Sequence, residues 1–384
     1  MHWPKATLRD SKRPLMAYRL LFPLAALYTL AVAPVWVELS GSRPTVVDTS
    51  WHGHEMLFGF ALAVIAGFLS TRPLRGSAWV LAGTWLTGRI AAATGSGITA
   101  VVAGMVFPLA LLTVSAPPLL TGAKGKENRV LPVILVALVC ADAAWWTGKT
   151  WFGQQVQSCA LLAAIDLIAL LLLLIGGRAL RAGVGGHLER QGIARQDYAQ
   201  RRYEIPLATL AGGAALADAL ALESVAGALC IGAALITLVR VMPRQLQRTV
   251  SHPHLWTLAL GYIWLVPGLV LKGIAQLGDT LPVGGMLHGI GIGALGTLTL
   301  VMMARTATLR ARKPIAKFWD IGFAAILVSA AALSRLLAVC IPAAQHKLLW
   351  LAAATWSGAF LILLARLWRT VMPARSGRTI ETGA

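Results

Sequence analysis

Long apolar runs follow one another along the whole sequence, and they leave few folds open to it. A helix needs about 20 apolar residues to cross the hydrocarbon core of a bilayer. Only helices and closed barrels satisfy their backbone inside lipid, and these runs are too long and too uniformly apolar for barrel strands. The sequence therefore predicts an all-α, polytopic transmembrane helical bundle of about twelve spans, at residues 15–37, 54–71, 78–95, 98–120, 130–147, 159–177, 205–222, 225–241, 255–276, 283–304, 318–341 and 347–368.

Basic residues lie mostly between these runs and predict the orientation of the bundle. Of the 34 Lys and Arg residues, 28 fall on the side of the N-terminus. The other six are Arg43, Lys149 and Lys347 on the opposite side, and Arg89, Lys272 and Arg335 inside spans. Because cytoplasmic loops are enriched in Lys and Arg, we expect both termini in the cytoplasm. Membrane orientation thus accounts for the net charge of +19, and we expect no nucleic-acid partner.

The chain is expected to form a single integral membrane domain over residues 1–384. The first six spans cover residues 15–177 and the last six cover residues 205–368. A basic cytoplasmic loop at residues 178–204 separates the two halves, and a short tail at residues 369–384 follows the last span. A division of six spans to six is also a plan of secondary transporters.

One stretch, Trp51–Phe60, concentrates side chains that bind metals. His52, His54, Glu55 and Met56 fall within five residues, at the outer end of the second span. Ionisable groups at the edge of a membrane span are costly and usually functional. The predicted topology places His288 in the outer half of the tenth span, and Arg89, Lys272 and Arg335 in the outer halves of theirs. These side chains therefore form one polar layer.

The layer suits a haem. Neutral imidazole is a common ligand of haem iron and a good ligand of copper, so His52, His54 and His288 are candidate metal ligands. Any of the three cations Arg89, Lys272 and Arg335 can pair with haem propionates. An alternative stays open, in which the histidines and cations pair with Glu55, Asp142 or Asp218 and only hold helices together.

Helix geometry limits how the first motif can bind a metal. Residues two apart on a helix point about 200° apart, so His52 and His54 cannot both bind one metal from a regular helix. If the helix begins early, His52 and Met56 share a face, and a thioether beside an imidazole suits copper. Two further histidines, His252 and His254, belong to the cytoplasmic side, and His187 is expected to be solvated.

Several motifs together resemble the NnrS family. Trp51–Phe60, continued by residues 64–69, resembles the hallmark segment of that family. The other matching stretches are Trp85 with Gly88 and Arg89, the segment from His252 to Trp256, and His288 with residues 291–305. The resemblance implies a bacterial inner-membrane protein of the nitric oxide response that contains haem and copper.

The leading hypothesis is therefore a membrane haem protein, with or without copper, that protects against nitric oxide or its metal–nitrosyl products. Its partners would be the lipid bilayer and a small gaseous or metal–nitrosyl ligand; the sequence points to no protein partner. Whether it is an enzyme stays open, because no electron-entry module is recognisable. The alternatives are a twelve-helix secondary transporter with the polar layer as its substrate site, and a scaffold subunit whose polar layer only packs helices.

Overall fold

The computed structural model describes residues 15–42, 48–70, 76–95, 97–121, 130–192, 201–241, 246–278, 280–315 and 318–371. Across these ranges the chain is helical and contains no strand, so the predicted all-α class is confirmed. Of the predicted tail, residues 372–384 lie outside the described residues, as do residues 1–14 and, in the predicted central loop, residues 193–200.

Ten of the described helices are long and apolar enough to cross a membrane. They include every predicted span except the third and the seventh, which are helices of lower apolarity or shorter length: α4 (Ser77–Thr94) and α10 (Glu204–Ala219). The helices of the first half are α1 (Tyr18–Ser42), α2 (Thr49–His54), η2 (Glu55–Ala61), α3 (Leu62–Leu69), α5 (Gly97–Thr121), α6 (Val130–Thr147), η4 (Gly148–Phe152) and α7 (Gln154–Leu171). Those of the second half are α11 (Glu223–Val241), α12 (Pro253–Ile263), α13 (Leu265–Leu277), α14 (Val283–Met286), η9 (Gly289–Gly296), α15 (Thr297–Arg310), α16 (Trp319–Cys340) and α17 (Gln345–Val371), with short 3-10 turns at Arg201–Tyr203, Leu246–Thr249 and Pro342–Ala344.

The predicted central loop is wrong in its first half. After α7 the chain stays helical through η5 (Leu172–Gly176), α8 (Gly177–Leu180), η6 (Arg181–Gly185) and α9 (Gly186–Arg190), forming one helix of 37 residues, Gln154–Arg190. The reason lies in an apolar stripe at helical spacing, because Leu180, Val184 and Leu188 are all buried. The basic residues of this segment occupy its other faces.

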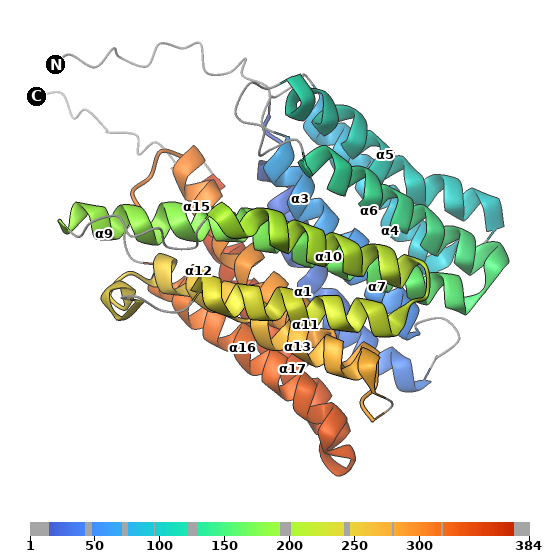
Figure 1. Ribbon diagram of the computed structural model, residues 1–384. Coiled ribbons are helices and arrows are strands. Elements are labelled where there is room, and N and C mark those ends of the chain that lie inside the picture. The colour runs from blue at the N-terminus through green and yellow to red at the C-terminus, as the bar shows by residue number, and fades with distance from the viewer. Residues whose placement is uncertain are drawn as a thin grey trace, which may run out of the picture.

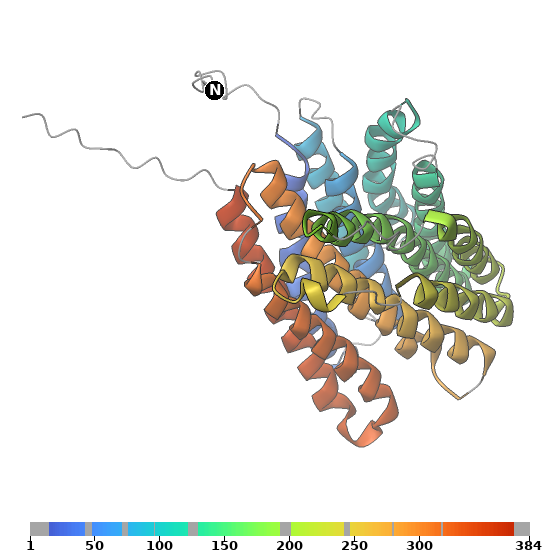
Figure 2. The same ribbon diagram turned by 60° about the vertical axis from the view of Figure 1, so that its left-hand side comes forward.

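Helix α7 runs through the middle of the bundle, with α4, α5 and α6 on one side and α16 and α17 on the opposite side (Figures 1 and 2). Helix α17 packs on α1 and α16, while α10 packs on α7 and α11. Helix α13 contacts both α11 and η9. The two segments that carry the predicted histidines, α2–η2 and α14–η9, both contact α7 and are thereby brought to the same central region.

Both of these segments widen into a π-helix just after their histidines, at η2 and at η9. A π-turn inserted in an α-helix often marks a functional site. The glycines of η9 let large neighbours approach it closely. A Cβ on Gly293 would lie 2.5 Å from the ring of Trp264, and a Cβ on Gly289 would lie 2.8 Å from the backbone of Gly268. Close helix packing, common in membranes, therefore explains this run of glycines.

Candidate functional site

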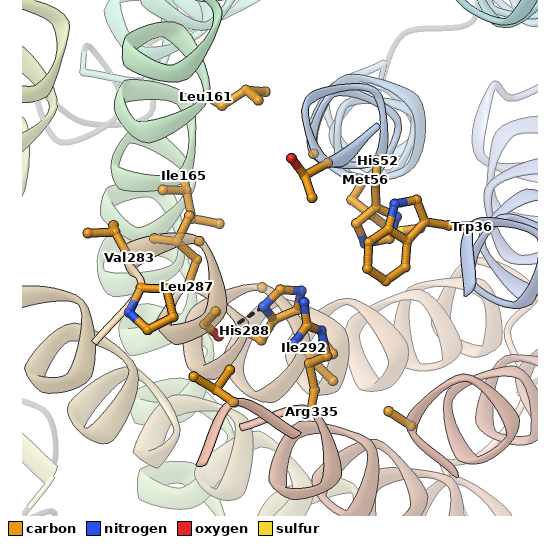
Figure 3. Close-up of a pocket in the computed structure, with 18 of the residues that line it drawn as sticks. Trp36, His52, Met56, Leu161, Ile165, Val283, Leu287, His288, Ile292 and Arg335 are labelled. Atoms are coloured by element: carbon orange, nitrogen blue, oxygen red, sulfur yellow. Dashed lines mark hydrogen bonds between the residues drawn. The ribbon is translucent and has the colours of Figure 1, made fainter. Parts of the chain in front are cut away.

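A cavity of about 720 Å³ lies between α1, α2–η2, α7, α14–η9, α16 and α17. Its walls are mostly apolar, as they are in many sites for small molecules and cofactors. Figure 3 shows Leu161 and Ile165 of α7 on one side of it, with the polar side chains spread around the rest. Four of the seven predicted site residues line it: His52, Met56, His288 and Arg335.

His52 reaches the cavity because its helix begins early. The Asp48 side chain caps α2 by accepting a hydrogen bond from the backbone N–H of Trp51, at 2.6 Å. The His52 ring stacks on Trp36 of α1, with centroids 4.5 Å apart and planes inclined by 28°. Its Nδ1 atom is buried and has no hydrogen-bond partner among the described residues. A buried polar atom without a partner is unusual and favours a bound ligand at this place.

Met56 lines the cavity one helical turn beyond His52, as expected if the helix begins before His52. Its Sδ atom accepts a hydrogen bond from the hydroxyl of Thr29, at 3.7 Å. Figure 3 draws both side chains on the same wall, next to Trp36.

His288 approaches from the opposite wall with one ring nitrogen free. Its Nδ1 lies 3.0 Å from the carbonyl oxygen of Gly285. Because a carbonyl only accepts, Nδ1 carries the proton, and the lone pair is on Nε2. The rings of His52 and His288 are nearly parallel, inclined by 16°, with centroids 6.4 Å apart. This gap is too wide for direct stacking of the two rings.

Arg335 of α16 brings a cation to the cavity. Its guanidinium lies 5.7 Å from the centroid of the Trp36 ring, in the range of a cation–π contact. Its Nε is buried and unpartnered, and no acidic side chain among the described residues pairs with it. A guanidinium in this position suits a carboxylate or another oxyanion.

A second polar group lies behind the first motif, outside the cavity, and is centred on Glu55. Arg89 donates to both carboxylate oxygens at 2.8 Å, and Tyr28 also donates to Glu55. The ring of His54 has Glu55 Oε1 2.9 Å from Nδ1 and Asp142 Oδ1 3.0 Å from Nε2. All these groups are buried or nearly so. With both ring nitrogens engaged by carboxyl groups, His54 has no lone pair to offer a metal in this conformation.

The seven predicted site residues therefore fall into three groups. His52, Met56, His288 and Arg335 face the cavity, whereas His54 and Arg89 belong to the Glu55 group. Lys272 is buried elsewhere, bonded to Asp166 and Asp218. The prediction that His52 and His54 face apart is confirmed. His54, Arg89 and Lys272 pair with carboxylates, which is the alternative that the sequence leaves open for them.

Sequence reasoning missed Trp36 and Asp166. The sequence does mark Asp166 as a candidate, since an acidic residue in the middle of an apolar span is rare and usually functional. The expectation of a solvated His187 is wrong, because the extension of α7 into α9 buries this ring against His252, with centroids 4.2 Å apart.

Among the described residues, no three His, Cys, Asp or Glu side chains are arranged to hold a bare metal ion. Haem iron needs fewer ligands from the protein than a bare metal ion does, because the porphyrin supplies the equatorial ligands and the chain only the axial ones. Two imidazoles on facing walls, a free arginine and an apolar cavity fit that demand.

Comparison with known proteins adds one finding. A family model described as NnrS protein matches residues 15–375. No curated protein matches the chain.

Proposed function

Because the chain belongs to the NnrS family, we propose that this multi-pass membrane protein binds haem in the cavity and serves the response to, and protection from, nitric oxide. The observation that carries the proposal is the pairing of His52 and His288 across the cavity, each with a ring nitrogen to which no described residue is hydrogen-bonded. Haem iron would supply the capacity to bind nitric oxide or a related small ligand.

Each cavity residue has a distinct part in this proposal. His288 would bind iron through Nε2, since the Gly285 carbonyl holds the proton on Nδ1 and so fixes the tautomer. His52, held against Trp36, would be a second ligand, one that nitric oxide would have to replace. Arg335 would pair with a propionate. If His52 did not bind iron, it and Met56 would together offer an imidazole and a thioether on one wall, which suits copper as a second metal.

We further propose the twelve-span arrangement with both termini in the cytoplasm of a bacterial inner membrane. The shorter helices α4 and α10 would complete the twelve spans. Under this topology Gln154, Glu223 and Gln345, which all line the cavity, lie at the outer ends of their helices. The cavity would then open in the outer half of the bilayer.

Tags inserted at Gln154 and at Gln191 test the topology. Gln154 begins α7, and Gln191 follows α9 at the far end of the same long helix. In intact spheroplasts an external protease should cut the tag at Gln154 and spare the tag at Gln191, because an odd number of crossings separates them. Cleavage of both tags, or of neither, would contradict the arrangement.

An absorption spectrum with metal analysis tests the function. We expect the full chain, purified in detergent, to contain about one haem per chain and its absorption to shift when nitric oxide is added. Absence of haem from protein made in haem-replete cells would overturn the proposal. That result would instead favour the transporter alternative, because the free Arg335 would equally suit an organic anion as substrate.

A further inference from the structure

A second ionic cluster lies inside the bundle, on the α10–α11 side of α7. Lys272 of α13 is completely buried, and its Nζ lies 3.0 Å from Asp166 Oδ2 of α7 and 2.8 Å from Asp218 Oδ2 of α10. It also lies 2.9 Å from Gln276 Oε1 and 3.4 Å from Cys230 Sγ. Four acceptors therefore surround an ammonium group that has three protons to donate.

The remaining polar atoms of this cluster are satisfied within it. The Gln276 amide donates to Asp218 Oδ1 at 2.6 Å, and the Cys230 thiol lies 3.8 Å from Asp166 Oδ1. Both aspartates are only 1% exposed. Cys159 of α7 and Glu223 at the start of α11 also interact electrostatically with this region, and neither brings a positive charge. Among the described residues, Lys272 is the one cation paired with these carboxyl groups.

The charges in this cluster do not balance if both aspartates are ionised. Two carboxylates would face one ammonium, and an unpaired buried charge is strongly destabilising. Both carboxyl groups also lie within 3.0 Å of the same ammonium nitrogen, so two negative charges would be held close together in a buried place, which favours a proton on one of them. The Glu55 group differs in this respect, because there Arg89 is paired with Glu55 and the two ring nitrogens of His54 lie between Glu55 and Asp142.

We propose that Asp166 and Asp218 share one bound proton, which makes this cluster a proton-binding site inside the membrane and separate from the cavity. Lys272 pairs with whichever carboxylate is ionised, and the other carboxyl group is neutral. The site is placed to communicate with the cavity, because the residue that precedes Asp166 is Ile165, part of the cavity wall. This inference does not depend on whether the cavity binds haem.

Infrared spectroscopy of the full-length protein tests the proposal directly. We expect the wild type to show the C=O stretch of a protonated carboxyl group that shifts in D₂O. Asp166→Asn and Asp218→Asn should each remove this contribution, since one carboxylate then remains to balance Lys272. Glu204→Gln is the matched control, because Glu204 is paired with Arg178 at 2.9 Å and its loss should leave the band unchanged. A band that persists in both Asn variants would overturn the proposal.

Stability in detergent gives a second test. Each single Asn variant should unfold close to the wild-type temperature, whereas the double variant should unfold far below it because Lys272 is left without a counter-charge. If either single change lowers the unfolding temperature as much as the double change, both carboxylates are needed as ions and the proposal is wrong. Should the Asn variants fail to fold, Lys272→Met should strengthen the protonated-carboxyl band, and an unchanged band would overturn the proposal.

Discussion

The variant His288→Ala is expected to lose the haem absorption band of the purified protein. His288 is the cavity imidazole whose Nε2 lone pair is freed by the hydrogen bond from Nδ1 to Gly285. Changing a partner that merely orients a metal ligand commonly lowers metal affinity by about 10- to 100-fold, so loss of the ligand itself should cost at least as much. Haem content per chain, measured after purification, gives the result, and added imidazole should restore part of the band by filling the vacated space.

Two histidine variants serve as controls for this experiment. His254→Ala changes a histidine of α12 that does not line the cavity and should leave the haem content unchanged. His54→Gln replaces a ring whose nitrogens both face carboxyl groups, and we expect its folded fraction to retain haem. If His54→Gln removes the band while His288→Ala keeps it, the assignment of the axial ligands is wrong.

The variant Arg89→Met is expected to be severely destabilised. Arg89 is 5% exposed and donates to both oxygens of the fully buried Glu55. Removing one partner of a buried ion pair typically costs about 3–5 kcal/mol, because the remaining charge is left uncompensated. Thermal unfolding in detergent, followed by tryptophan fluorescence, should show a large fall in the midpoint together with poor expression.

The double variant Arg89→Met with Glu55→Gln separates charge from packing. It removes both members of the pair and leaves His54 to balance Asp142, so it should recover much of the stability that Arg89→Met loses. A double variant that is less stable than Arg89→Met alone would show that the Glu55 carboxylate contributes more through its contacts with Tyr28 and His54 than through its charge balance with Arg89.

The helical fold is well predicted from the sequence, because the bilayer fixes both the length and the composition of a span. The prediction of a loop after residue 177 failed for a related reason. Basic residues do not end this helix, which continues beyond its apolar core as long as one stripe, here Leu180, Val184 and Leu188, stays buried. Charge marks where a helix leaves lipid and does not mark where it ends.

The site is predicted only in part, because the depth of a residue in the membrane does not give its direction. Helix geometry alone correctly predicts that the side chains of His52 and His54 point in different directions. The partners of Arg89 and Lys272 depend on the rotation of neighbouring helices about their axes, and the π-turns at η2 and η9 change that rotation locally. The apolar pattern of a span does not reveal a π-turn, so the division of the polar layer into three groups depends on helix packing that the sequence pattern does not encode.

The continuous helix Gln154–Arg190 has a mechanical consequence. Its 37 residues, at 1.5 Å each, make a rod roughly 55 Å long, whereas the hydrocarbon core is about 30 Å thick. Even a strongly tilted rod of this length protrudes from the lipid. Leu161 and Ile165 near one end line the cavity, and His187 near the other end packs on His252, so one continuous helix joins the cavity wall to a histidine contact that lies about 30 Å away along its axis.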